Sequence, residues 1–579
     1  LTARQMALVS APLVVEPNPE TGDDGRPEEE EDPPTSSAQV TYDEAHTYVR
    51  QAHYDHAGRP RAVELPLDPD HAGTAPLIVG RLLYNARGLP AAAIAGLYDE
   101  EFVPADPNDN LLRQQVVVQS IAYTRDGLVS SISYGDTDDG SSSGSRTPTV
   151  SSMSYDVRRR PIRMRTVRST SEGEHPLDGV TVVADQELAW DRANNLVAVL
   201  DHRDPLEWPA GRRPQSVRIR HDGLYRVTHA DYEYTQEDGS HGVEDDGTDW
   251  RGAFNAAQGN DPMRQEPATM AVVPPTGTGA RVVSQTWSWD FLANQTESTD
   301  DRATFYERSL GAIANGHDDA ALTRPTALYF AHTLGEPVER SGWLEADYGA
   351  GGNLVALTVH AQCHAEGDAE AACEVGTGSV SSLIGGLRES CECEHEQHFV
   401  YRWDELNRLA EARRYDRVAL GDWTLGTRQR YRYDGANQRT LKQTIGQSGC
   451  VTPPTSGTPC ERTALYVYPG DFERRGLLRG SSAYEANATL GTETQYVVAG
   501  ARVVLRSQSF SSDDYLRDER MVVAVGDLLH TTSAAFDVRT GRLVEASTYY
   551  PGGGRETLLS VPVAAAEASG NTGKEADEE

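Results

Sequence analysis

The stretch "CECEHEQH", from Cys391 to His398, holds the residues with the clearest capacity for chemistry. Cys391, Cys393, His395 and His398 offer two sulfurs and two imidazoles, which are the ligand types of structural zinc sites. A metal held in this way could support a metal-assisted hydrolase. The spacing differs from the usual zinc motifs, because a single residue separates Cys393 from His395. A metal site is therefore the weaker interpretation, and we predict no cofactor.

Disulfide chemistry is the stronger interpretation of the six cysteines, Cys363, Cys373, Cys391, Cys393, Cys450 and Cys460. Cys363 and Cys373 flank a short polar stretch, and Cys450 and Cys460 flank another of equal length, which suits two local disulfides across loops. Disulfides among the first four cysteines, or a reactive thiol pair, are the alternatives. Because disulfides persist outside a reducing cytosol, we expect a secreted, extracellular or cell-surface protein.

Carboxylates and aromatic rings that recur along the chain could bind or cleave glycans, since paired carboxylates carry out glycoside hydrolysis. The Asp residues, however, stand at one fixed position after an aromatic residue, which favours a role in capping a turn. The aromatic residues are typical of cross-strand ladders. We therefore assign no catalytic residue and predict that the chain is not an enzyme.

The elements that position these residues are set by a repeat. Stretches such as "HYDHAGRP", "LYNARGLP", "AWDRANNLVAV", "RWDELNRL" and "RYDGANQRTL" recur, mostly about 30 to 40 residues apart, a spacing typical of repeat architectures. In each copy an aromatic residue ends one strand, a polar residue caps the turn, and a Gly or Asn four positions after the aromatic takes a left-handed conformation. An aliphatic residue then begins the next strand, so each copy predicts a β-hairpin.

These positions are predicted to be structural. The aromatic, capping and left-handed residues are Tyr54, Asp55, Gly58, Tyr84, Gly88, Tyr123, Gly127, Trp190, Asp191, Asn194, Trp289, Asp290, Tyr348, Gly352, Trp403, Asp404, Asn407, Tyr433, Asp434 and Asn437. Three copies carry Arg159, Tyr225 or Ala293 at the left-handed position, and for these we expect a different loop length. The stretch 401–416 has helical spacing, but the repeat predicts a strand, a turn and a strand there.

Composition limits the classes of partner. The 579 residues carry a formal net charge of -35, which repels nucleic acid and anionic lipid. No segment approaches the roughly 18–20 apolar residues that a membrane span needs. The chain begins with Leu1, so we expect a fragment of a longer polypeptide, with no visible secretion signal.

The repeated stretches "YDHAGR", "WDRANNLV", "WDELNRL" and "YDGANQR" resemble the YD, or RHS, repeats of bacterial polymorphic toxins, insecticidal toxin complexes and the teneurin ectodomain. The resemblance runs from about Tyr42 to Glu556. The stretches 492–504 and 531–556 and the terminal "TGKEADEE" are similar to the segment at the start of the RHS-associated core. The resemblance implies an all-β fold, in which a long spiralling strip of antiparallel hairpins forms part or all of a hollow shell.

Composition and the resemblance together predict an organisation along the chain. Residues 1–39 are predicted to be an acidic, Pro-rich linker or disordered arm. Residues 40–470 form the hairpin array, with loop insertions near 135–149 and 251–279. Residues 471–560 form a further β segment of the same shell, and residues 561–579 are the frayed start of a truncated core.

Three functions remain open. The first is a non-catalytic shell segment of a secreted or injected toxin, which encloses a C-terminal effector polypeptide and also contacts toxin-delivery or surface partners. The second is a glycan-binding or cell-surface adhesion module that uses exposed Tyr and Trp side chains. The third is the metal-assisted hydrolase centred on Cys391 to His398. The repeat series favours the first.

Overall fold

The structure is a computed structural model, and it describes part of the chain. The described residues are 2–9, 41–66, 77–99, 101–136, 147–169, 177–208, 215–235, 241–242, 282–301, 310–315, 325–330, 341–368, 371, 373, 386–419, 422–445, 461–467, 472–479, 484–486, 492–497, 501–506, 520–526, 532–538, 541–549 and 555–560. The predicted insertion near 251–279, most of the one near 135–149 and the terminal 561–579 lie outside them.

A single antiparallel sheet contains all 33 strands of the described residues. Almost every strand pairs with the next along the chain, so the sheet is a continuous meander. The first part comprises β1 (Thr2–Val9), β2 (Thr41–Tyr54), β3 (Pro60–Glu64), β4 (Leu77–Tyr84), β5 (Pro90–Tyr98), β6 (Leu111–Tyr123), β7 (Val129–Tyr134), β8 (Val150–Tyr155), β9 (Pro161–Val167), β10 (Val182–Trp190), β11 (Leu196–Asp201), β12 (Gln215–His221), β13 (Val227–Thr235) and β14 (His241–Gly242).

The middle of the strip continues the same pattern. It comprises β15 (Ser284–Trp289), β16 (Gln295–Asp300), β17 (Gly311–Asn315), β18 (Pro325–Phe330), β19 (Gly342–Tyr348), β20 (Leu354–Ala365), β21 (Cys391–Trp403), β22 (Leu409–Ala419), β23 (Asp422–Tyr433), β24 (Arg439–Ile445), β25 (Glu461–Val467), β26 (Phe472–Arg479), β27 (Tyr484–Ala486), β28 (Thr492–Tyr496) and β29 (Ala501–Arg506). Helical backbone in the described residues is confined to a short 3-10 turn, Pro205–Glu207, and residues 386–390. None of it is long and apolar enough to cross a membrane.

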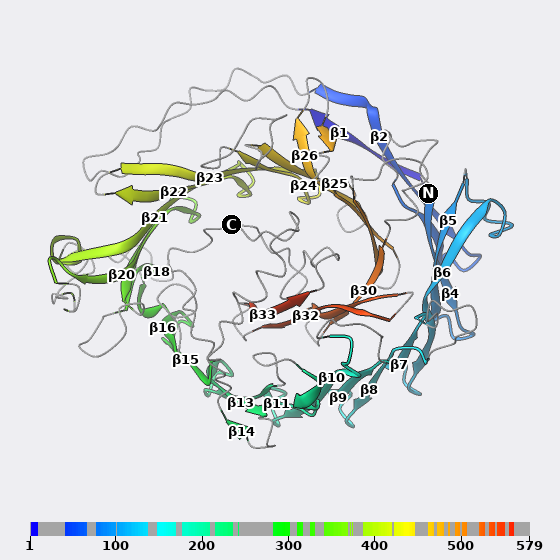
Figure 1. Ribbon diagram of the computed structural model, residues 1–579, viewed down its shortest axis with the longest axis horizontal. Coiled ribbons are helices and arrows are strands. Elements are labelled where there is room, and N and C mark those ends of the chain that lie inside the picture. The colour runs from blue at the N-terminus through cyan, green and yellow to red at the C-terminus, as the bar shows by residue number, and fades with distance from the viewer. Residues whose placement is uncertain are drawn as a thin grey trace.

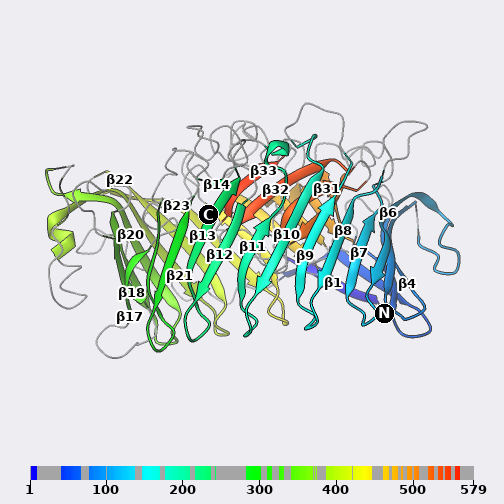
Figure 2. The ribbon, with the colours of Figure 1, turned by 90° about the horizontal axis from the view of Figure 1, so that it is seen from below.

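The last strands are β30 (Arg520–Gly526), β31 (Thr532–Asp537), β32 (Leu543–Tyr549) and β33 (Arg555–Ser560). Figure 1 shows the strip curling into a ring, with β30 to β33 lying inside the ring that the earlier strands form. Figure 2 shows outer strands such as β7 to β13 from the side, inclined and lying next to one another along the wall. The all-β prediction of a spiralling strip of antiparallel hairpins is confirmed.

The largest apolar cluster joins the inner strands to the outer wall. Val523, Phe536 and Leu543 of the inner strands pack with Ile78 and other residues of the β4–β10 region, and all are buried. The Phe536 ring meets the Tyr134 ring edge-on, with their centroids 5.0 Å apart. Burial of apolar area is the main force that holds the end of the strip inside its first turn.

Two polar contacts fix the position of the inner strands on the wall. The Arg542 guanidinium donates to both oxygens of Asp178, at 2.9 and 3.0 Å. Arg168 Nη1 donates to the Gly541 carbonyl oxygen at 2.8 Å, and Arg168 is itself buried. Such charge-assisted bonds are directional, so they fix the position of the inner strands relative to the outer wall.

Two local predictions can be compared with the strands, and one of them is corrected. Thr2–Val9 forms β1 and pairs with β2, so the prediction of a linker or disordered arm was wrong for these residues. Residues 10–40 lie outside the described residues. The stretch 401–416 forms the end of β21, a turn and most of β22, and its helical spacing does not produce a helix. Pairing along β21 and β23 overrides local propensity, as tertiary context commonly does.

Candidate functional site

The repeated turns share one hydrogen-bond pattern. In all ten predicted copies the amide after the aromatic residue donates to the carbonyl oxygen four positions later, at 2.8 to 3.0 Å. The amide at the left-handed position donates back to the residue that opens the turn, as Gly58 does to Asp55 at 3.0 Å. Each hairpin is thus a type I turn closed by a left-handed residue and a bulge.

Positive φ occurs at each of these positions. The residues are Gly58, Gly88, Gly127, Arg159, Asn194, Tyr225, Ala293, Gly352, Asn407 and Asn437, with φ between 58° and 90°. The expectation of a different loop length at Arg159, Tyr225 and Ala293 was wrong, because their turns make the same two backbone bonds. The two bonds and the cap offset the cost of a left-handed residue with a Cβ atom, about 1–2 kcal/mol.

The turn carboxylates bind their own turn. Asp55 Oδ1 accepts from the amides of Ala57 and Arg59, at 2.8 and 2.9 Å, and Oδ2 accepts from Arg59 Nε at 2.8 Å. Asp191, Asp290, Asp404 and Asp434 accept from the same two amide positions. The Arg59 amide and guanidinium hold the pKa of the Asp55 carboxyl at about 2. A carboxyl held so far below neutral pH cannot act as the general acid of a glycosidase.

The aromatic residues link each repeat to the one before it. Seven of them donate from the ring hydroxyl or indole N–H to the carbonyl oxygen six positions after the aromatic residue of the preceding copy, at 2.6 to 2.8 Å. The pairs are Tyr84 to Pro60, Tyr123 to Pro90, Tyr155 to Val129, Trp190 to Pro161, Trp289 to Val227, Trp403 to Leu354 and Tyr433 to Leu409. A net gain of about 1 kcal/mol for each bond ties successive hairpins together.

Arginines extend the same link. Arg408 Nε pairs with Asp404 Oδ2 at 2.6 Å, and Arg408 Nη1 reaches the next turn, where it donates to Asp434 O at 3.2 Å and Asn437 Oδ1 at 3.1 Å. Its guanidinium also lies 4.9 Å from the centre of the Tyr433 ring. The connections of an antiparallel meander alternate between two edges, so these ten turns all lie on one edge of the strip.

These contacts bear on the adhesion hypothesis. Trp289 and Trp403 are half-buried, and each uses its indole N–H within the sheet. Tyr54, which precedes the first link, is 47% exposed. The geometry of the two tryptophans supports ladders between repeats and gives no particular support to glycan stacking.

The cysteines form two disulfides at the other edge of the strip. Cys363 on β20 bonds to Cys393 on β21, and Cys373 bonds to Cys391. The predicted local pair, Cys363 with Cys373, was wrong, and the alternative of disulfides among these four cysteines is what the structure contains. Cys363 and Cys393 are direct partners in the β20–β21 register, with Cα atoms 4.0 Å apart. Cys450 and Cys460 lie outside the described residues.

The predicted alternative zinc ligands do not converge. Cys391 and Cys393 are bonded to different cysteines. His398 is buried, and its Nδ1 lies 2.9 Å from Thr358 Oγ1, while its ring meets Trp423 edge-on at 6.2 Å. His395 is half-buried opposite Ala361. Among the described residues, Cys393 alone of the four belongs to a group of potential ligands.

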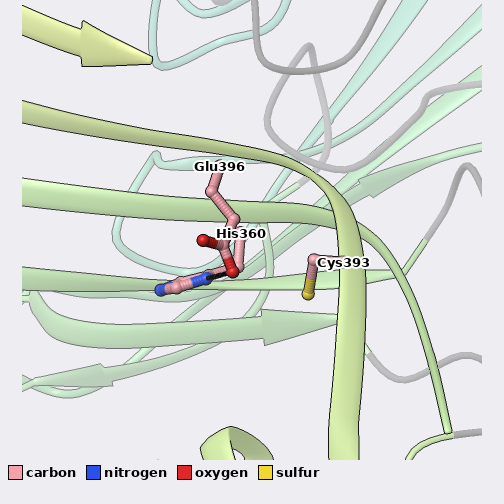
Figure 3. Close-up of side chains that lie close together, drawn as sticks. All are labelled: His360, Cys393 and Glu396. Carbon is pink, nitrogen blue, oxygen red and sulfur yellow. Dashed lines mark hydrogen bonds and ion pairs between the residues drawn. The ribbon is translucent and has the colours of Figure 1, made fainter. Parts of the chain in front are cut away.

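That group is His360, Cys393 and Glu396, whose ligand atoms lie within 4.8 Å of one another (Figure 3). His360 is buried on β20 directly opposite Glu396, and its Nδ1 lies 3.1 Å from Glu396 Oε1. His360 Nε2 lies 3.8 Å from Glu345 Oε1, and the Trp343 ring stacks on the imidazole at 4.2 Å. We name these five residues the His360 cluster.

Two arginines complete the charges of the His360 cluster. Arg388 pairs with Glu345 at 2.5 Å, and Arg417 pairs with Glu396. Burial alone would raise the pKa of Glu396, but the hydrogen bond and charge of His360, followed by those of Arg417, lower this pKa to about 2. Glu396 is therefore an ionised carboxylate that is largely shielded from solvent.

Sequence reasoning did not identify His360 or Glu396 as site residues. Glu396 lies inside "CECEHEQH", and the signal that brings His360 to it is the β20–β21 register. This register depends on the length and path of the connection between β20 and β21. The hairpin repeat does not predict that connection.

The fold was compared with known proteins. No protein-family model matches the sequence, and no curated protein matches it. Among solved structures, the crystal structure of TcdB2-TccC3-TEV matches with a TM-score of 0.52 and 14% identity over 93% of this chain. The structure of TcdB2-TccC3 without its hypervariable C-terminal region matches with a TM-score of 0.51 and 14% identity, again over 93% of this chain. This chain has the YD-repeat shell fold.

The match is partial in the other direction. This chain covers 19% of each of these two matched chains, so it spans about a fifth of their length. At such low identity the likeness concerns the fold. It agrees with the repeated turns and the curled strip, which are the features that define the YD-repeat shell fold here.

Proposed function

We propose that this chain is a non-catalytic section of the wall of a hollow toxin shell, which encloses a C-terminal effector polypeptide. The observation that carries the proposal is the packing of β30 to β33 inside the ring, through the apolar cluster around Phe536 and the Arg542–Asp178 pair. Because the last strands are held inside the ring, the strip is a curved wall around an interior. Such a wall could enclose an effector polypeptide.

The row of turns supports the same function. Each hairpin buries little by itself, and the links from aromatic and arginine side chains join it to its neighbour. Repeats tied in this way give a stiff strip, and pairing of neighbouring strands leaves few free edges. In this proposal, the Asp, Tyr and Trp residues of the repeats stabilise the wall.

The partners and location follow from the shell. The effector is the partner inside it, and toxin-delivery or surface proteins are the partners outside it. Two disulfides at one edge of the strip support function in an oxidising, extracellular setting. The likeness in fold to chains of TcdB2-TccC3 supports a toxin complex as the assembly.

Protease protection tests the proposal. The complete polypeptide that contains this chain is expressed with an epitope inside its C-terminal segment and treated with protease. We expect the epitope to be protected in the wild type and in Phe291→Asp, whose side chain is 86% exposed, and to be cleaved in Phe536→Asp, which disrupts the inner packing. Equally rapid cleavage in the wild type and in Phe536→Asp would contradict enclosure.

A further inference from the structure

The His360 cluster lies against a disulfide. His360 and Cys363 are 5% and 2% exposed, so both side chains are protected from solvent. Cys393 Sγ, His360 and Glu396 lie together, but the bond to Cys363 occupies the sulfur. Reduction of the disulfide would therefore place two thiols beside a buried imidazole and a carboxylate.

We propose that reduction of the Cys363–Cys393 disulfide opens a buried zinc site, with the two thiolates, His360 Nδ1 and a Glu396 carboxylate oxygen as its four ligands. A dithiol reductant supplies two electrons to the S–S bond and closes to its own disulfide, leaving two thiols. Zn²⁺ then displaces the two thiol protons to solvent. Two sulfurs, one imidazole and one carboxylate are all established zinc ligand types.

The distances fit a tetrahedral ion. Zinc bonds of about 2.0–2.3 Å place two ligand atoms roughly 3.3–3.8 Å apart. His360 Nδ1 and Glu396 Oε1 are already 3.1 Å apart, and the ligand atoms of His360, Cys393 and Glu396 all lie within 4.8 Å of one another. The Cys363 sulfur is bonded to the Cys393 sulfur, and the two residues are direct partners in the register, so we expect both sulfurs to remain beside His360 and Glu396 after the bond opens.

Surrounding residues are placed to support a zinc-bound histidine. When Nδ1 binds the metal, the ring proton resides on Nε2, and Glu345 Oε1 lies 3.8 Å from it, so a shift of under 1 Å would bring the two into hydrogen-bond distance. A carboxylate on the far nitrogen orients the ring and strengthens it as a ligand. Arg388 holds Glu345, and Trp343 stacks on the imidazole, so the ring has little freedom to turn away.

The test uses a chain in which Cys363 and Cys393 are the only cysteines, because the other thiols could bind zinc themselves. The background variant carries Cys373→Ser, Cys391→Ser, Cys450→Ser and Cys460→Ser. Zinc content and affinity are measured with a chromogenic chelator, without oxygen, before and after dithiol treatment. We expect no bound zinc in the oxidised protein and one zinc per chain after reduction.

Two further variants assign the ligands. In this background, His360→Gln is expected to weaken zinc binding at least tenfold, and His395→Gln, a matched histidine on β21, is expected to leave it unchanged. Cobalt gives a second readout in the background chain, because thiolate-to-Co²⁺ charge-transfer absorption requires both reduction and sulfur ligation. No zinc after reduction, a disulfide that stays closed in the folded protein, or equal affinity in His360→Gln would each overturn the proposal.

Discussion

The packing of the inner strands predicts a large and local effect of truncating Phe536. The side chain is fully buried, and its ring contacts Tyr134 of the outer wall. Replacement of a buried Phe by Ala costs about 3–5 kcal/mol, from the lost burial and the cavity that remains. Because 1.4 kcal/mol corresponds to a factor of ten, opening of the inner strands should become roughly 10²- to 4 × 10³-fold more frequent.

Hydrogen exchange measures that opening strand by strand. In Phe536→Ala, we expect faster amide exchange in β30 to β32 and in the facing β6–β7 region, while the distant β21–β23 region keeps its rates. Phe291→Ala is the matched control, because Phe291 is 86% exposed and exposed substitutions usually change stability by less than about 0.5 kcal/mol. If Phe536→Ala accelerated exchange no more than Phe291→Ala, the inner strands would not depend on this contact and the reasoning would be wrong.

Three other predictions concern the cluster and the turns. The pKa of Glu396 is lowered from 4.5 to about 2, which corresponds to about 3 kcal/mol of stability that is present above pH 4.5 and lost as the pH falls toward 2. The difference in stability between the wild type and Glu396→Gln, followed by denaturant titration, should shrink over that range, and a constant difference would refute the prediction. Trp403→Phe removes the bond to the Leu354 carbonyl and should cost about 1–2 kcal/mol in a chemical denaturation curve, whereas an unchanged curve would show that the link contributes nothing. Ala293→Gly should stabilise by about 0.5–1 kcal/mol because Ala293 has φ +68°, while Ala193→Gly in an equivalent turn should not; a melting temperature that moves equally in both would contradict the strain argument.

The hairpins were predictable because their determinants are local. An aromatic residue, a capping carboxylate and a left-handed residue recur at fixed offsets, and each acts within one turn. Arg159, Tyr225 and Ala293 show that the cap and backbone bonds are sufficient even where Gly or Asn is absent. The expectation of altered loops there gave too much weight to the left-handed residue and too little to the Asp that precedes it.

The features that were missed depend on contacts between distant residues. Cys363 pairs with Cys393 because β20 and β21 align them, and a short polar stretch beside Cys363 is no guide to that register. The same alignment joins His360 to Glu396. The Arg542–Asp178 pair and the cluster around Phe536 join segments more than 300 residues apart, for which a repeat pattern contains no signal.

The central claim is that the strip closes into a wall with its last strands packed inside. An electron cryo-microscopy map of the complete polypeptide that contains this chain tests it most directly. The account predicts a hollow shell, with β30 to β33 against the inner face of the β4–β10 wall and density for an enclosed chain. An open strip, or an array whose last strands lie outside the ring, would contradict it.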